Sequence, residues 1–317
     1  MSRLKRGLQL YFSSVILYGL GILLFHYLPY YQRTLNDKTQ LTLLGLFWGY
    51  LVLAPILYFF FVKEYSENKS YHLAKAAIRN GRSLFQSSTQ LGLEKEEKVA
   101  LLFILVKIFF LPTMIGFFYG NWSNLSFNNF QWYPFLLTLL FTIDTLIFSL
   151  GYIFESHKLN NIVKSVEPTF FGWFVALICY PPFNSIVGAY IPWGASDQVT
   201  FWSSGWTITL RIIIILLLAI YVWATVALGM KSSNLTNRGI VTKFPYSIVR
   251  HPAYISKNLM WWVTLLPVMN WPFALGMGVW SVIYFFRAWT EERHLSKDPD
   301  YVEYCKKVKW RFIPYLI

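Results

Sequence analysis

The stretch LQLYFSSVILYGLGILLFHYL, from Leu8 to Leu28, contains no lysine, arginine, aspartate or glutamate. A helix needs about 20 consecutive apolar residues to cross a bilayer once. The apolar region of a signal peptide is shorter and is followed by a cleavage site of small residues, and this stretch fits neither feature. We therefore expect a first helix that stays in the membrane.

The rest of the chain continues this pattern. Its 317 residues are 56% hydrophobic and 20% aromatic but only 14% charged, whereas ordinary soluble domains have about 25% charged residues. We predict an all-α, polytopic integral membrane protein with about eight transmembrane helices and a cytoplasmic tail. The expected spans are 8–28, 41–62, 99–119, 133–153, 170–190, 206–230, 255–268 and 273–287.

The last two spans are short, and the sequence MNWP between them predicts a tight helical hairpin. We expect two regions, which are a six-span membrane region at residues 1–230 and a C-terminal region at residues 231–317. The first of these contains a long cytoplasmic loop at residues 63–98.

The net charge of +13 does not indicate a nucleic-acid partner, because the basic residues lie in short segments between spans. With eight crossings, 24 of the 28 lysines and arginines fall on the side that carries both termini. The positive-inside rule then places both termini in the cytoplasm. A bacterial inner membrane and the endoplasmic reticulum both remain open as the location.

The 63–98 loop contains a helical pattern. Apolar residues form one stripe, and basic residues recur at helical spacing on another face; these are Leu73, Ala77, Leu84 and Phe85, and Lys75, Arg79 and Arg82. One interpretation is a short helix lying on an anionic leaflet. The other is an ordinary helix packed on the neighbouring spans.

Two charged residues lie deep within expected spans. If the third and fourth spans are antiparallel, Lys107 and Asp144 have matching depth and could pair, which would remove two isolated charges from lipid. A role for them in a substrate path is the alternative.

Cysteine and metal patterns are sparse. Cys179 falls inside a span and Cys305 in the tail, so we expect two free thiols. No CxxC, HExxH or P-loop pattern occurs, and we therefore expect no metal site and no Walker-type nucleotide site.

The stretch VRHPAYISKN, from Val249 to Asn258, places polar residues at the start of the hairpin. His251 offers a hydrogen-bond donor and an acceptor, Pro252 fixes the backbone, and Tyr246 and Tyr254 offer aromatic faces.

The stretch FRAWTEERHL follows the hairpin and contains Arg287, Glu291 and Glu292. Positions 287 and 291 are one helical turn apart, so the arginine could brace a carboxylate. Because the hairpin returns the chain to the same membrane depth, we expect the RHP segment and the acidic pair to be adjacent.

These motifs resemble those of the isoprenylcysteine carboxyl methyltransferase and phospholipid methyltransferase superfamily. The resemblance rests on RHPAY, then R-x-x-x-E-E-R-x-L, Y-x-x-Y and a closing I-P-Y, over about residues 231–317. It implies an S-adenosylmethionine-dependent methyltransferase that binds the cofactor at the cytoplasmic face. The methyl acceptor would be a lipid or a prenylated molecule that enters from the bilayer.

The resemblance also implies roles for the residues. Carboxylates and aromatic faces favour a sulfonium cation, and here they would be Glu291, Glu292, Tyr246 and Tyr254. Arg250 or His251, next to Pro252, would take the cofactor's carboxylate. Arg287 would orient an anionic acceptor, and Glu292 would set the geometry of Arg287, which makes this pair the candidate catalytic residues. Lys257 and Asn258 would contact the acceptor head group.

The sequence departs from the family pattern at Phe244 and Ser256, where glycine is frequent, and both residues add bulk near the expected pocket. Two other functions remain open. The ending YCKKVKWRFIP, Tyr304 to Pro314, is similar to that of NADPH-dependent membrane reductases of the sterol-reductase type. A non-enzymatic membrane protein with a degenerate pocket is the third alternative.

Overall fold

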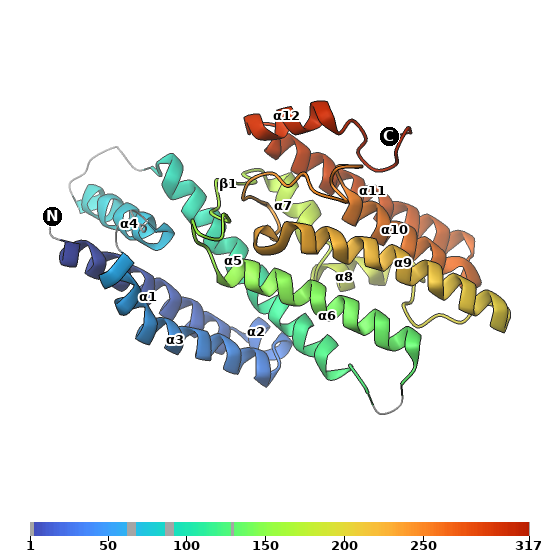
Figure 1. Cartoon of the computed structure of the whole chain (residues 1–317). Coiled ribbons are helices and arrows are strands. Elements are labelled where there is room, and N and C mark those ends of the chain that lie inside the picture. Colours follow the sequence, from blue (N-terminus) through green and yellow to red (C-terminus); the bar gives the residue numbers. More distant parts are fainter. Residues whose placement is uncertain (1–2, 62–67, 86–91, 128–129, 317) are drawn as a thin grey trace. The chain divides into compact units, whose positions relative to one another are not determined.

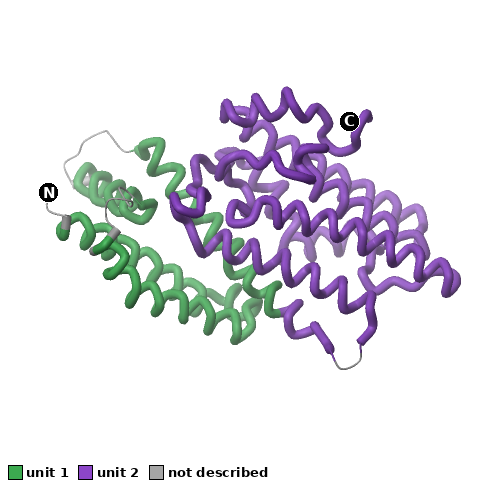
Figure 2. Tube along the Cα trace, viewed as in Figure 1, with its two compact units in different colours: residues 1–119 green, residues 120–317 purple. Residues whose placement is uncertain are grey.

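The computed structural model describes residues 3–61, 68–85, 92–127 and 130–316. Over these residues the chain forms twelve α-helices, two short 3₁₀ helices and one two-stranded sheet (Figure 1). It divides into two compact units, residues 1–119 and residues 120–317, each with hydrophobic clusters of its own (Figure 2). The predicted boundary at 230/231 lies inside the second unit, so a separate role for residues 231–317 stays a prediction.

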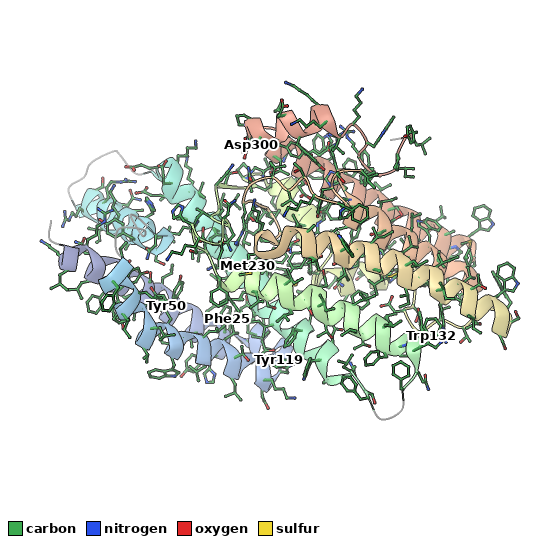
Figure 3. The ribbon with its side chains drawn as sticks, viewed as in Figure 1. Phe25, Tyr50, Tyr119, Trp132, Met230 and Asp300 are labelled. Atoms are coloured by element: carbon green, nitrogen blue, oxygen red, sulfur yellow. The ribbon has the colours of Figure 1, made fainter. Side chains whose placement is uncertain are left out.

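The first unit is built on long helices. Its elements are α1 (Arg3–Tyr27), α2 (Pro29–Thr34), α3 (Asp37–Phe61), α4 (Lys69–Phe85) and most of α5 (Lys95–Ser123). Phe25 belongs to a buried cluster with Tyr31, Leu43 and Ile115. Tyr50 packs against a second cluster, and Figure 3 labels both Phe25 and Tyr50.

The helix predicted inside the 63–98 loop is present as α4. Asn68, just before it, donates from Nδ2 to Ser14 Oγ at 2.9 Å and to Tyr58 OH at 2.9 Å. Arg79 of its basic face pairs with the buried Glu97, with 2.6 Å between Nη2 and Oε2. These contacts favour a helix packed on its neighbours over one lying on a leaflet. Residues 62–67 and 86–91 of the predicted loop lie outside the described residues.

The second unit contains the remaining elements. They are α6 (Trp132–Ile153), β1 (Ser165–Val166), α7 (Phe170–Leu177), α8 (Phe183–Tyr190), α9 (Ser204–Leu228), η1 (Gly229–Lys231), β2 (Thr236–Asn237), α10 (Pro252–Leu265), η2 (Leu266–Val268), α11 (Trp271–Leu295) and α12 (Pro299–Lys307). Helices α6, α9 and α10 share a core that includes Leu137, Ile214, Leu218, Val222 and Met260.

Five of the described helices are long and apolar enough to cross a membrane. These segments are Leu4–Tyr27, Asp37–Tyr58, Lys95–Ser123, Trp132–Ile153 and Ser204–Lys231. They coincide with the predicted spans 8–28, 41–62, 99–119, 133–153 and 206–230. The described part of the chain thus supports an all-α membrane protein, while eight crossings and their orientation stay predictions.

The predicted span 170–190 is wrong as a single helix, because the structure has α7 and α8 in its place. The sequence between them contains Pro181 and Pro182. Proline has no backbone N–H to donate, and it disfavours the helical conformation of the residue before it. The chain therefore stops one helix and begins another.

Helix α7 and the residues that follow α8 nevertheless pack on α11. At one end Phe171 contacts Phe286 edge to face, with ring centroids 5.6 Å apart. At the other end Gly276 has no room for a side chain, because an added Cβ would overlap with the carbonyl oxygen of Pro192. The broken segment therefore packs closely on the C-terminal hairpin.

The predicted hairpin is present as α10 and α11. Asn270 caps the N-terminus of the second helix, because its side chain accepts a hydrogen bond from the N–H of Phe273 at 2.9 Å. Helix α11 does not end near residue 287 as expected but continues to Leu295. Arg287 and the acidic pair consequently lie on one continuous helix.

The two-stranded sheet joins two loops that follow α6 and α9. Ser165 pairs with Asn237 and Val166 with Thr236 in antiparallel register. The end of α11 lies at the same place, because His294 Nε2 and Ser165 Oγ are 2.8 Å apart. This end of the second unit holds most of the polar residues predicted to form a site.

Candidate active site

A cavity of about 130 Å³ lies where α7, α9, α10 and α11 meet the segments before β2 and before α10. One water needs about 10–15 Å³, so this volume is roughly ten times what a single water requires. Predicted site residues that line it are Tyr246, Arg250, His251, Tyr254, Lys257, Arg287 and Glu291. The other three, Pro252, Asn258 and Glu292, do not line it.

Arg287 is a buried cation, 9% exposed, that the structure surrounds with neutral groups. Its Nη2 donates to Asn234 Oδ1 and, at 3.4 Å, to Tyr180 OH. Its guanidinium carbon lies 5.4 Å and 5.3 Å from the ring centroids of Tyr180 and Tyr254 and 5.8 Å from that of Tyr284. Among the described residues no carboxylate forms an ion pair with it.

Such an arrangement stabilises the cation through ring quadrupoles and amide dipoles rather than through a counter-charge. A buried charge without a counter-charge is costly unless a ligand compensates it. The arrangement is therefore suited to binding an anionic group.

Asn234 is fixed so that its carbonyl oxygen meets Arg287. Tyr152 OH accepts from the backbone N–H of Asn234 at 2.7 Å and from its Nδ2 at 3.0 Å. With the amide nitrogen bound to Tyr152, the amide oxygen faces the guanidinium. Helix α6, which carries Tyr152, thus sets the position of the arginine from outside the hairpin.

Glu292 does not brace Arg287, which corrects the predicted pairing. Its Oε1 lies 3.1 Å from Arg250 Nη1 and 3.2 Å from His251 Nε2, and its Oε2 lies 3.0 Å from Arg311 Nε. Five residues along a helix correspond to a rotation of about 140°, so Arg287 and Glu292 point in different directions.

Burial alone would raise the pKa of the Glu292 carboxyl. The hydrogen bond and charge of His251, with the charges of Arg250 and Arg311, outweigh burial and hold this pKa below its usual value. Glu292 is therefore an anion that joins the RHP turn to the tail.

The RHP turn is held by the C-terminal tail through backbone bonds. The N–H groups of Arg250 and His251 donate to the carbonyl oxygens of Trp310 and Arg311 at 2.9 Å and 2.8 Å. Pro252 occupies the first turn of α10, where its missing N–H costs no hydrogen bond. The adjacency of the RHP segment and the acidic pair, expected from the hairpin, is confirmed by the contacts of His251 with Glu292 and of Tyr254 with Glu291. The tail supports the RHP turn, but Trp310 and Arg311 do not line the cavity.

Tyr254 connects the two helices at the mouth of the cavity. Its OH donates to Glu291 Oε2 at 2.7 Å. Its ring stacks on that of His251, with centroids 5.4 Å apart and planes 5° apart. Glu291 itself is exposed, so the mouth presents a carboxylate beside two stacked rings.

Lys257 is a second cation that lines the cavity. Its Nζ lies 4.9 Å from the ring centroid of Tyr221 and 5.3 Å from that of Trp261. Tyr221 OH donates to Asp144 Oδ2 at 2.9 Å. Asp144 thus positions a cavity ring, whereas its predicted pairing with Lys107, a residue of the first unit, stays a prediction.

Asn258 faces the partner helix of the hairpin instead of the cavity. Its Oδ1 accepts from Ser281 Oγ at 3.2 Å, which ties α10 to α11. The two departures from the family pattern also lie outside the cavity lining. Phe244 is exposed and contacts Trp223, and Ser256 donates to the carbonyl oxygen of Pro252 at 2.7 Å. The bulk expected near the pocket therefore does not enter it.

Several cavity residues were missed by sequence reasoning. They are Glu167, Tyr180, Tyr221, Asn234, Tyr284 and His294. Asn234 belongs to the polar run SNLTNRG, which offered a signal. Tyr180 and Glu167 come from the broken segment and the loop before it, and only the packing of that segment on α11 brings them to the site.

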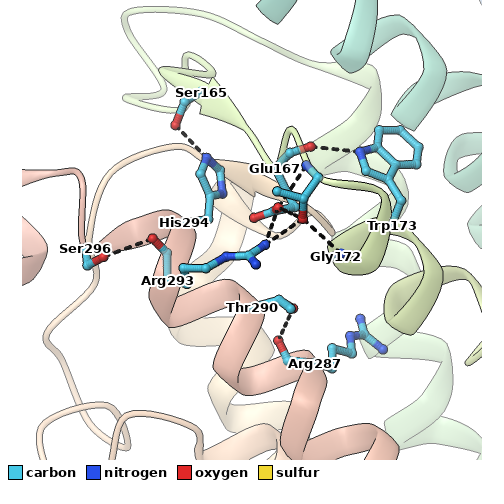
Figure 4. A network of polar contacts seen from close by, with 10 residues as sticks. Ser165, Glu167, Gly172, Trp173, Arg287, Thr290, Arg293, His294 and Ser296 are labelled. Carbon is cyan, nitrogen blue, oxygen red and sulfur yellow. Dashed lines mark hydrogen bonds and ion pairs between the residues drawn. The ribbon is translucent and has the colours of Figure 1, made fainter.

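Glu167 lies in a network at the end of α11 (Figure 4). Arg293 Nη2 donates to Glu167 Oε1 at 2.7 Å, and Trp173 Nε1 donates to the carbonyl oxygen of Glu167 at 2.7 Å. His294, held by Ser165, lies in the same network (Figure 4). Burial lowers the pKa of the His294 imidazole from its ordinary value of 6.5, so the neutral form is favoured there.

Residues 205–298 match the phospholipid methyltransferase family. The resemblance predicted from RHPAY and the acidic pair is thereby confirmed for this segment. Searches of curated proteins and of solved structures gave no match.

The phospholipid methyltransferase match includes α9, the RHP turn, α10 and α11. It therefore contains the cation Arg287 and the carboxylates Glu291 and Glu292. It ends before the tail that holds the RHP turn, and it begins after Glu167 and Tyr180. With the five apolar helices, the match supports a membrane methyltransferase that acts on a lipid.

Proposed function

We propose that this protein is an integral membrane methyltransferase that uses S-adenosylmethionine to methylate a lipid. The observation that carries the proposal is the cavity in the second unit, where the RHP turn meets the acidic end of α11. The cavity is also lined by Arg287, which is buried and forms no ion pair with a carboxylate among the described residues. The family match over residues 205–298 supports the reaction class and the lipid substrate.

The residues present fit S-adenosylmethionine, whose sulfonium supplies an electrophilic methyl group when the cofactor is bound. Glu291 and the rings of Tyr254 and Tyr246 would stabilise the positive charge of the sulfonium. Arg250 lines the cavity, and its buried Nε has no hydrogen-bond partner among the described residues. A buried N–H group normally has an acceptor, and the carboxylate of the cofactor would supply one.

Arg287 and Lys257 would hold an anionic group of the acceptor. Both cations line the cavity, both lie over aromatic rings, and neither forms an ion pair in the described part of the chain. The planar guanidinium binds phosphate or carboxylate oxygens with two parallel hydrogen bonds, and the ammonium adds a point charge. We propose a lipid with an anionic head group as the acceptor.

The chain's own contribution to methyl transfer would be positioning and exclusion of water. Transfer is an in-line displacement, so alignment of the two reactants supplies much of the rate. Arg287 is itself aligned by Asn234 and Tyr152, which pre-sets its direction before a substrate binds. Glu292 would act as a positioning residue, because it holds the RHP turn and the tail but does not line the cavity.

Direct binding separates this function from a reductase and from a non-enzymatic protein. The full chain in lipid nanodiscs would be titrated calorimetrically with S-adenosylhomocysteine and, separately, with NADPH. We expect S-adenosylhomocysteine to bind with a dissociation constant of about 1 μM, or about −8 kcal/mol, and NADPH to give no heat. Binding of NADPH alone would support the reductase, and binding of neither would support a protein without this activity.

We also propose that both termini and the cavity face the cytoplasm, on the basis of the bias in lysine and arginine. In a variant with Cys179 and Cys305 changed to serine, a single cysteine at the exposed Ser247 or Ser126 would report the side. An impermeant maleimide should label Ser126→Cys in intact cells and Ser247→Cys only after permeabilisation. The reverse pattern would refute the orientation.

A further inference from the structure

Glu167 is a buried carboxylate of the cavity that lies outside the family match. It follows β1, it is 3% exposed, and it lines the same cavity as Arg287 and Tyr254. The matched segment begins at residue 205, so the family pattern does not account for Glu167.

The two oxygens of this carboxylate have different surroundings. Oε1 accepts hydrogen bonds from Arg293 Nη2 at 2.7 Å, from the Thr169 N–H at 3.0 Å and from Thr169 Oγ1. Oε2 is buried and has no hydrogen-bond partner among the described residues. An anionic oxygen that is buried without a donor is costly, since a carboxylate needs its lone pairs satisfied.

The surrounding chain holds this carboxylate in place. Trp173 fixes the backbone of Glu167 through its carbonyl oxygen. The side chain lies directly on Gly172 in the first turn of α7, where an added Cβ would overlap with the Cγ and Cδ of Glu167. Oε1 is therefore anchored by its hydrogen-bond donors, whereas Oε2 of this cavity-lining residue has none among the described residues.

The polar surroundings indicate which ligand group Oε2 would accept from. Arg293 already neutralises the carboxylate, so a hydrogen-bond donor without a full positive charge suffices. His294 and Ser165, both polar, lie in the same network, at the end of α11 beyond its apolar stretch. A polar cofactor is a better match for this position than an acyl chain or a head group held at Arg287.

We propose that Oε2 of Glu167 accepts a hydrogen bond from a hydroxyl or amino group of the nucleoside part of the methyl donor. The inference rests on the proposed function and extends it, because it assigns a binding residue from the segment before the family match. Carboxylates bind ribose hydroxyls in this way in dinucleotide-binding proteins.

Glu167→Gln tests the role of this one oxygen. The amide oxygen can keep the bonds to Arg293 and Thr169, and the amide nitrogen then replaces Oε2, which turns an acceptor into a donor. Affinity for S-adenosylhomocysteine, measured by calorimetry on the full chain in nanodiscs, should fall about 10- to 100-fold. The matched control is Thr169→Val, which removes a donor to Oε1 but does not touch the cavity. It should lower the melting temperature and leave the affinity within about threefold.

Glu167→Asp provides a second variant if the glutamine variant does not fold, because it keeps the charge for Arg293 and withdraws the oxygens by one methylene. It should also lower the affinity for S-adenosylhomocysteine. An unchanged affinity in a folded variant would overturn the inference while leaving the proposed function intact. A change confined to the KM of the lipid acceptor would likewise overturn it and assign Glu167 to the lipid. Absence of S-adenosylhomocysteine binding by the wild-type protein would overturn both proposals.

Discussion

Two faces of α11 carry opposite electrostatic arrangements within one and a half turns. On the cavity face, Arg287 is a buried cation that only neutral groups and aromatic rings surround. On the tail face, Glu292 is an anion that contacts Arg250, His251 and Arg311. The anion of the tail face is therefore paired within the protein, whereas the cation Arg287 of the cavity face has no counter-charge among the described residues.

The comparison shows that charge in a motif has two uses. Glu292 pairs with basic residues of the chain itself, so we expect its removal to lower the free energy of unfolding. Neither Arg287 nor Lys257 forms an ion pair among the described residues, so we expect their removal to affect binding and turnover.

The largest effect on stability is expected for Glu292→Gln. The change leaves Arg250, His251 and Arg311 without their shared anion, and breaking a buried ion pair costs about 3–5 kcal/mol. Because Arg311 is 42% exposed and partly screened by water, we expect a loss near the lower end, about 3 kcal/mol of unfolding free energy.

Thermal unfolding in nanodiscs measures this loss. The adjacent Glu291→Gln is the matched control, because Glu291 is exposed and bonds only Tyr254 among the contacts described. Equal destabilisation by the two variants would show that the contacts of Glu292 on the tail face do not contribute specially to stability.

A smaller effect is expected to distinguish Lys257 from its neighbour Asn258 on α10. Lys257→Met keeps the length of the side chain but removes a cavity cation, and we expect the KM for an anionic lipid to rise about tenfold. Asn258→Ala removes only the bond to Ser281, which costs about 1 kcal/mol of stability and leaves the KM unchanged. Steady-state kinetics with defined phospholipids distinguishes the two. A larger kinetic effect for Asn258→Ala would restore that residue to the substrate site and contradict the geometry.

The smallest effect concerns the pH dependence of stability at His294. Its pKa is lowered by burial, so the unfolded chain takes up a proton before the folded chain does as the pH falls below 6.5. Stability is therefore lost on acidification through this window. His294→Gln, which retains an amide to bond Ser165, should flatten the decline in melting temperature below pH 6.5. An unaltered pH profile would mean that another group titrates there.

The sequence predicted the parts of the fold that depend on local composition. Five apolar runs became helices long enough to cross a membrane, and MNWP became the turn of a hairpin. That hairpin was sufficient to predict that His251 and Tyr254 would meet the acidic pair, which the distances of 3.2 Å and 2.7 Å confirm. The break at Pro181 and Pro182 had a local signal as well, but the apolar residues around it outweighed that signal.

The choice of partners was not predictable from spacing. Arg287 and Glu292 were expected to pair, yet the helix turns them apart and Arg311 from the tail takes Glu292 instead. Asn234 reaches Arg287 only because Tyr152 of α6 orients its amide. Glu167 reaches the cavity through the packing of α7, which a linear reading of the sequence cannot supply.

Arg287→Met tests the central claim, that the cavity face binds an anionic lipid for methylation, most directly. The variant keeps an unbranched side chain among the rings of Tyr180, Tyr254 and Tyr284 but removes the charge. Methyl transfer from labelled S-adenosylmethionine to defined phospholipids would be measured beside calorimetric binding of S-adenosylhomocysteine. We predict that turnover falls about 100-fold, while cofactor affinity stays within about threefold and the melting temperature does not fall. Wild-type turnover in a folded Arg287→Met protein would contradict the account.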